Sequence, residues 1–97
     1  MMRQIVLRPQ AQDDIDKIWD YSAAQWDMDQ ADAYVGDIRA ALRLIATSPS
    51  IGSDYTFLAR GLRKFNSGSH AIFYLHGDQS IDIVRILHQR MDAGGRI

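Results

Sequence analysis

A chain of 97 residues has room for one hydrophobic core and, on folding, buries roughly 60–65% of the surface that it exposes when unfolded. Cysteine is absent, which excludes disulfides, thiolate nucleophiles and thiolate metal sites and fits a reducing compartment. No apolar run has the length of a membrane span, and the N-terminus lacks the apolar block of a signal peptide. We therefore expect a cytoplasmic protein without a membrane partner.

The net charge of −1 hides an uneven distribution along the chain. Residues 1–50 hold five Lys or Arg against eight Asp, whereas residues 51–97 hold six against four. Two surfaces of opposite sign with different partners are one interpretation, and an ordinary solvated mixture is an equally good one.

Residues 3–8 have an apolar centre and stop at Pro9, which predicts a short strand. Pro9 suits the first turn of a helix, because no backbone donor is needed there. The spacing predicts an amphipathic helix of about four turns. Its inward positions recur at helical intervals: Ala11, Ile15, Ile18, Trp19, Ser22 and Trp26. Trp19 and Trp26 are seven residues apart, so we expect both to pack in the core.

A second helix is expected after Asp29, a plausible N-cap, and the break at residues 48–52 ends it. Residues 53–60 are either a loop or a poor edge strand. Strands are predicted at residues 62–67, 70–76 and 80–88, with turns at Gly68-Ser69 and Gly77-Asp78. The order strand, helix, helix and three strands predicts an α+β fold, in which a helical hairpin packs on one face of a mostly antiparallel sheet.

The predicted sheet has apolar residues on both faces. Ala71, Phe73 and Leu75 point one way and Ile72 and Tyr74 the other. In the last strand, Ile81 and Ile83 are likewise opposed by Val84 and Ile86. A sheet of this kind needs a second cover besides the helices, which favours a tight protein partner. The alternative is that loops and the C-terminal tail supply that cover, although the tail, residues 92–97, is not expected to be core.

The last third of the chain is basic. Six basic or imidazole side chains fall on or next to its strands: Arg63, Lys64, His70, Arg85, His88 and Arg90. A buried guanidinium at Arg85 must reach solvent, pair with Asp82 or Asp92, or accept a partner's carboxylate. His88 is either a hydrogen-bonded structural residue or part of a functional surface. His70 and His76 are about 20 Å apart on one strand, so no metal site is expected.

In order along nearly the whole chain, the sequence resembles the ParE toxins of bacterial type II toxin–antitoxin modules, in the RelE/ParE superfamily. The match is carried by Leu7-Arg8-Pro9-Gln10-Ala11, Asp13-Asp14-Ile15, Ile18-Trp19-Asp20-Tyr21, Gln30-Ala31 with Tyr34, Ser48-Pro49-Ser50-Ile51-Gly52, Gly61-Leu62-Arg63, Gly68-Ser69-His70-Ala71-Ile72-Phe73-Tyr74 and Ile83-Val84-Arg85-Ile86-Leu87-His88-Gln89-Arg90-Met91-Asp92. The resemblance implies one ParE-like toxin domain over residues 1–97.

The same resemblance implies a protein that poisons DNA gyrase without any cofactor. A ParD-type antitoxin would hold it inactive in a hetero-oligomer and would make the DNA contacts, so that the toxin meets DNA only indirectly. One alternative is an inactive protein that still binds the antitoxin but has lost toxicity. Another is a RelE-like ribosome-dependent mRNA endonuclease, which needs paired general acid and base groups. The endonuclease hypothesis is the weaker one, because the chain has no glutamate and no tyrosine after His88.

Two sets of site residues are expected on this basis. Contacts with the antitoxin are expected on the helical hairpin and the open sheet face, at Trp19, Ile72, Tyr74 and Arg85. Toxicity toward the target is placed near the C-terminal end, at Arg63, His88, Gln89 and Arg90. Because ParD-type antitoxins are acidic in the segment that binds the toxin, the resemblance gives Arg85 a carboxylate of the antitoxin as its partner.

Overall fold

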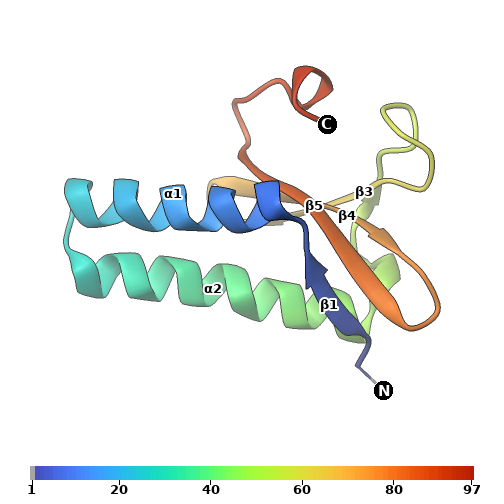
Figure 1. Cartoon of the computed structure of the whole chain (residues 1–97), viewed down its shortest axis with the longest axis horizontal. Coiled ribbons are helices and arrows are strands. Elements are labelled where there is room, and N and C mark those ends of the chain that lie inside the picture. The colour runs from blue at the N-terminus through green and yellow to red at the C-terminus, as the bar shows by residue number, and fades with distance from the viewer. Residues whose placement is uncertain (1) are drawn as a thin grey trace.

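The computed structural model describes residues 2–97 and shows a hairpin of two helices packed on one face of a five-stranded sheet (Figure 1). Its elements are β1 (Gln4–Leu7), α1 (Pro9–Gln25), α2 (Met28–Thr47), the 3-10 turn η1 (Pro49–Ile51), β2 (Ser53–Asp54), β3 (Arg63–Ser67), β4 (His70–His76), β5 (Ser80–His88) and the 3-10 turn η2 (Ala93–Gly95). Neither helix in this part of the chain is long and apolar enough to cross a membrane.

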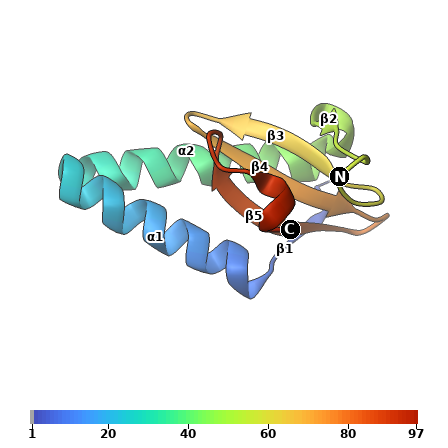
Figure 2. The ribbon, with the colours of Figure 1, turned by 90° about the horizontal axis from the view of Figure 1, so that it is seen from above.

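The strand order is β1-β5-β4-β3-β2, with β1 parallel to β5 and every other pair antiparallel. The first strand therefore lies beside the last, at one edge of the sheet, and in the view of Figure 2 the helix α2 passes behind the sheet. This arrangement confirms the predicted α+β fold. The region left open at residues 53–60 holds a two-residue edge strand, β2, followed by a loop.

Both helices begin where the local sequence favours a helix start. Pro9 occupies the first turn of α1, as predicted, and the helix runs for 17 residues, nearly five turns. The N-cap of α2 is Asp27 rather than the expected Asp29, because the Asp27 side chain accepts a hydrogen bond from the Gln30 amide at 2.7 Å. At the tip of the hairpin Trp26 is 64% exposed, so its expected place in the core is wrong.

The main core lies between the sheet and the helical hairpin. It contains Ile15 and Ile38 from the two helices and Ile72, Tyr74 and Ile83 from β4 and β5. Tyr74 is fully buried, and its hydroxyl donates to the Pro49 carbonyl at 2.6 Å and accepts from the Gly52 amide at 3.0 Å. These two hydrogen bonds satisfy the buried hydroxyl and fasten the turn η1, which follows α2, to the sheet.

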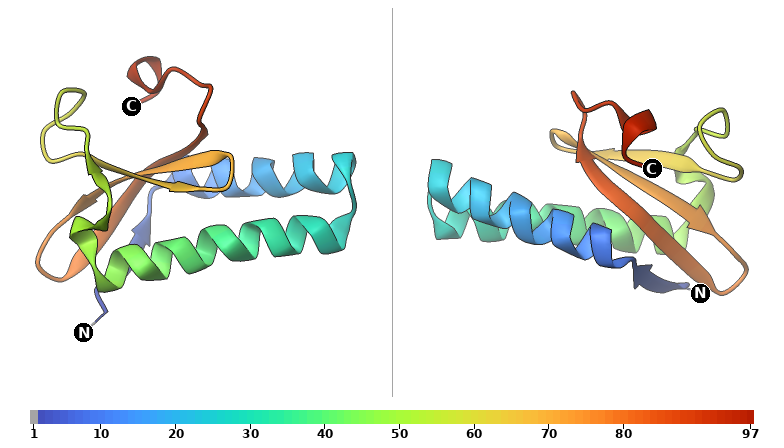
Figure 3. Two further views of the ribbon diagram at one scale, coloured as in Figure 1. Left: turned by 180° about the vertical axis from the view of Figure 1, so that it is seen from behind. Right: turned by 45° about the horizontal axis from the view of Figure 1, so that its top comes forward.

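The opposite face of the sheet has a second, smaller core, built from Leu62, Ala71, Phe73, Val84 and Leu87. Tyr55, Leu58 and Ala59 of the loop after β2 pack against it, together with Leu75 and with Ala93 of the tail. Figure 3 shows this loop and the C-terminal segment on the side of the sheet away from the helices. The chain thus supplies its own second cover. The expectation that the sheet needs a partner for this purpose is wrong. The tail adds only the partly buried Ala93 to this cover and its other residues are exposed, as expected for a segment outside the core.

A β-bulge in β5 changes which residues face the helices. Phe73 pairs with Arg85 and the next residue, Tyr74, pairs with Ile83, so Val84 is an extra residue in β5. Beyond the bulge the alternation is shifted by one position. Ile86 therefore joins the main core with Ile83, whereas the regular alternation had placed it on the other face with Val84.

Candidate functional site

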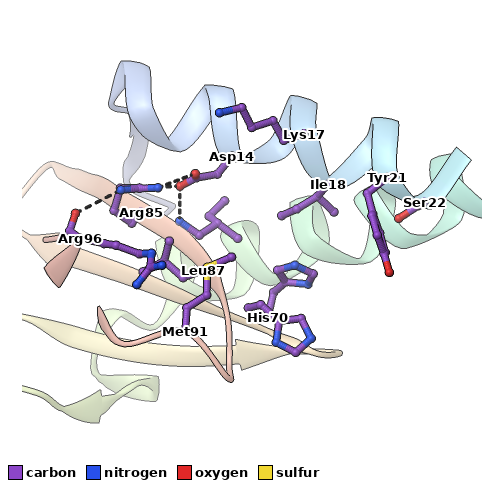
Figure 4. A pocket seen from close by; sticks show the side chains of 12 residues that line it. Asp14, Lys17, Ile18, Tyr21, Ser22, His70, Arg85, Leu87, Met91 and Arg96 are labelled. Atoms are coloured by element: carbon purple, nitrogen blue, oxygen red, sulfur yellow. Dashed lines mark hydrogen bonds and ion pairs between the residues drawn. The ribbon is translucent and has the colours of Figure 1, made fainter. Parts of the chain in front are cut away.

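A groove of about 470 Å³ lies between α1, the end of β5 and the C-terminal segment (Figure 4). Its lining residues are Asp14, Lys17, Ile18, Tyr21, Ser22, His70, Arg85, Ile86, Leu87, His88, Met91 and Arg96. The groove exists because β1 pairs only with Ser80–Ile83 and the chain then turns into α1. Beyond Ile83, the outer edge of β5 therefore faces α1 across the groove instead of another strand.

An ion pair forms one end of the groove. The Asp14 carboxylate accepts hydrogen bonds from Nε and Nη2 of Arg85, both at 2.8 Å, and from the Ile86 amide at 2.9 Å. The hydrogen bonds with Asp14 raise the pKa of Arg85. Nη1 of Arg85 also donates to the Arg96 carbonyl at 3.1 Å, as the dashed lines in Figure 4 show. This network ties the first helix, the last strand and the tail together.

Arg85 therefore has its carboxylate partner inside the chain. The partner is Asp14, whereas the sequence analysis had considered Asp82, Asp92, solvent or a carboxylate of the antitoxin. Asp82 instead pairs with Arg8 at 2.7 Å, and Asp92 caps η2 by accepting from the Gly94 amide at 3.0 Å. The expected ion pair between Arg85 and an antitoxin carboxylate is thus replaced by an internal one.

Two imidazoles form the other end of the groove. The ring centroids of His70 and His88 are 5.3 Å apart in an edge-to-face arrangement. Nδ1 of His70 lies 2.6 Å from the Tyr34 hydroxyl, and Nδ1 of His88 accepts from the Arg90 amide at 3.1 Å. Burial lowers the pKa of His70, and the repulsion that would arise if both His70 and His88 were charged lowers it further. An imidazole in this position stays neutral at pH values where an ordinary histidine begins to charge.

The C-terminal segment that follows β5 is held close to the groove. The amide and the side-chain nitrogen of Gln89 donate to the carbonyls of Ser69 and Gly68, each at 2.9 Å, and the Met91 amide donates to the His88 carbonyl at 2.9 Å. Arg90 is exposed between these anchored residues. The turn thus holds Arg90 at the surface beside His88 and Gln89.

The other expected site residues lie elsewhere. Ile72 and Tyr74 have 0% exposure beneath the helices, so the expectation that they contact an antitoxin is wrong for this structure. The Arg63 guanidinium donates to the carbonyls of Ser50 and Gly52, and it holds η1 against β3. Trp19 is half-buried on the hairpin, where its indole donates to Asp32 at 2.8 Å.

Sequence reasoning missed the helical wall of the groove, although Asp14 carried a usable signal. Asp14 lies three residues after Ala11 and four before Ile18, on the stripe of α1 that faces the core. A carboxylate on an apolar stripe needs a partner, because an unpaired buried charge is unstable. Across residues 2–97, no group of three or more His, Cys, Asp or Glu side chains is placed to hold a metal ion.

Comparisons with known proteins agree along the length of the chain. The family model described as "ParE toxin of type II toxin-antitoxin system, parDE" matches residues 5–93. The chain is 40% identical over 94 residues to Toxin ParE1 of Mycobacterium tuberculosis, and the aligned region covers 96% of each sequence. It is 38% identical over 92 residues to Toxin ParE1 of Caulobacter vibrioides, and the aligned region covers 95% of each sequence.

Two solved structures share the fold. One, titled "Chromosomal ParDE TA system from P. aeruginosa", has a TM-score of 0.77 at 19% identity and covers 90% of this chain and 96% of that one. The other is the toxin–antitoxin complex RelBE2 from Mycobacterium tuberculosis, with a TM-score of 0.67 at 15% identity over 92% of this chain and 100% of that one. The family match and the identities to the two curated toxins establish that this chain belongs to the ParE toxin family of type II toxin–antitoxin systems.

Proposed function

We propose that this ParE-type toxin poisons DNA gyrase and that a ParD-type antitoxin neutralises it in a hetero-oligomer. The observation that carries the proposal is the family match over residues 5–93, which includes every groove residue except Arg96 and the C-terminal segment up to Ala93. The solved ParDE system that shares the fold supports an antitoxin of the ParD type. Contacts with DNA are then made by the antitoxin, and the toxin itself acts as one domain over its whole length.

The groove gives neutralisation a simple physical basis. His88 and Met91 line it, and Gln89 and Arg90 lie between them at the surface. An antitoxin segment in the groove would cover part of the surface that the toxin needs for its target, so the two partners would compete. We propose His88, Gln89 and Arg90 as the target-binding residues, and Trp19 on the hairpin as a further antitoxin contact.

The same geometry argues for action by binding rather than by cleavage of RNA. A nuclease needs free cations to hold a phosphate, and two arginines on the basic strands are engaged within the chain. Arg85 is bound to Asp14, and Arg63 is bound to backbone carbonyls of η1 and Gly52. The ribosome-dependent endonuclease therefore remains the weaker alternative.

An assay of the two targets side by side tests this function. The purified toxin should inhibit supercoiling by gyrase, or trap gyrase on cleaved DNA, and should leave messenger RNA on translating ribosomes intact. Addition of the ParD-type antitoxin encoded beside the toxin gene should restore supercoiling. Cleavage of the messenger together with normal supercoiling would reverse the assignment.

A further inference from the structure

The hydrogen bonds of the two groove imidazoles determine where each ring carries its proton. The Tyr34 hydroxyl accepts from the Ser69 amide at 3.0 Å and lies 2.6 Å from Nδ1 of His70. If Nδ1 carried the proton, the hydroxyl hydrogen would have no acceptor among the described residues. Tyr34 therefore donates to Nδ1, and the neutral ring of His70 carries its hydrogen on Nε2.

His88 has the same tautomer for an independent reason. Its Nδ1 accepts from the Arg90 amide at 3.1 Å, so its neutral ring also carries the hydrogen on Nε2. Neither Nε2 has a hydrogen-bond partner within residues 2–97, and neither is a buried unsatisfied atom. Two accessible N–H donors of fixed tautomer thus belong to rings whose centroids are only 5.3 Å apart.

The surroundings of the pair indicate the chemical class of the ligand. Ile18, Leu87 and Met91 line the groove with apolar atoms. Two of the three cations that line the groove are paired with carboxylates, Arg85 with Asp14 and Lys17 with Asp13 at 2.9 Å. The third, Arg96, donates to the Asp92 carbonyl at 2.9 Å. A phosphate site would present free arginines or lysines, whereas two neutral N–H donors beside an apolar wall suit one carboxylate on a peptide.

We propose that His70 and His88 form a carboxylate-binding pair at one end of the groove, which takes an acidic side chain of the antitoxin while an apolar side chain of the same segment packs on Ile18, Leu87 and Met91. This inference rests on the proposed function, since it takes the antitoxin as the occupant of the groove. In this proposal the two imidazoles bind the carboxylate of the antitoxin. Arg85 does not, because it is already paired with Asp14.

Matched substitutions separate the Nε2 donors from the structural hydrogen bonds. Asparagine keeps an acceptor near the position of Nδ1 and removes the outer donor, whereas glutamine keeps a donor near Nε2 and removes the inner acceptor. His70→Asn and His88→Asn should each weaken binding of the antitoxin by about tenfold or more, as expected for loss of a hydrogen bond to a charged group. His70→Gln and His88→Gln should lose less. His76→Asn, on the exposed end of β4, is the control and should bind like the parent.

The measurement is calorimetric titration of the full-length toxin with a synthetic peptide of the acidic C-terminal segment of the ParD-type antitoxin encoded beside it. A second readout on the unmodified toxin is nitrogen-15 NMR of the imidazoles. Both rings should be in the Nε2–H form, and both should shift when the peptide is added. A peptide that binds the parent and both Asn variants equally well, or rings that do not respond to it, would overturn the carboxylate pair and leave the antitoxin function standing. A parent that binds neither this peptide nor the whole antitoxin would refute the proposed function and this inference together.

Discussion

Asp14→Ala should be among the most destabilising substitutions on the surface of the groove. Asp14 is 9% exposed, and its carboxylate is the acceptor for three hydrogen bonds, two from Arg85 and one from the Ile86 amide. Its loss leaves a partly buried guanidinium and a buried backbone donor without their partner. Arg85 retains its bond to the Arg96 carbonyl, which cannot replace a charge.

The size of the effect follows from the geometry. Removing one partner of a buried ion pair costs about 3–5 kcal/mol of unfolding free energy. The Arg85 side chain is 17% exposed and can turn toward water, so we expect the lower end, about 3 kcal/mol. For a chain of this length, that loss corresponds to a fall in melting temperature of about 12–24 °C. Asp14→Asn keeps an oxygen for the Ile86 amide and should lose roughly half as much free energy.

Urea unfolding followed by circular dichroism measures the loss directly, and a neighbouring residue provides a matched control. Asp13 also pairs with a cation, Lys17, but that pair is exposed. Asp13→Ala should therefore leave the unfolding midpoint unchanged within error. If Asp13→Ala and Asp14→Ala unfold at the same urea concentration, the internal ion pair does not hold α1 to β5, and the reasoning fails.

Three further predictions concern pH, the exposed Arg90 and the core. Burial and the neighbouring His88 lower the pKa of His70, so the folded chain disfavours the charged ring. The unfolding free energy should therefore be fully retained at pH values above 6.5, the ordinary pKa of histidine, and should fall as the pH drops below that value. Urea titrations at a series of pH values should show this fall and should show less of it in His70→Asn. Arg90→Ala should reduce growth arrest more than antitoxin affinity, since the side chain is exposed beside the groove; full toxicity with impaired antitoxin binding would contradict the proposed division of surfaces. Tyr74→Phe should lose about 1–3 kcal/mol in urea unfolding, because the Gly52 amide and the Pro49 carbonyl lose their buried partner; an unchanged midpoint would show that water replaces the hydroxyl.

The regular part of the fold was readable from the sequence because local signals agreed with one another. Helical spacing located α1 and α2, and the turn dipeptides Gly68-Ser69 and Gly77-Asp78 bounded β4. The bulge at Val84 was not readable, because β5 is apolar at positions on both sides of it and its pattern permits either register. The cover over the second core was foreseen only as an alternative, because the loop residues that provide it have no periodic pattern.

The site was predicted in part. Placing His88, Gln89 and Arg90 together at one end of the molecule needed only their adjacency in the chain. The partners of Arg63 and Arg85 could not be found in the same way. Arg85 meets a carboxylate 71 positions away, and Arg63 binds carbonyl groups, which every residue has. A basic residue in a sequence shows that a charge is present, but its partner is decided by the tertiary fold.

The parallel pairing of β1 with β5 has a consequence for the order in which the toxin is made. At the end of this pair, Arg8 is hydrogen-bonded to Asp82, 74 positions further along the chain. During synthesis, β1 therefore cannot form its hydrogen bonds to the sheet until β5 has also been made. Until β5 has emerged, the helical hairpin has no completed sheet on which to bury its apolar stripe. The wall of the groove opposite α1 and residues 88–91 come largely from β5 and the segment after it. A nascent or prematurely terminated chain that stops before Ser80 therefore has neither a stable core nor the surface proposed to act on the target, so we expect incomplete products of translation to be harmless to the cell that makes them.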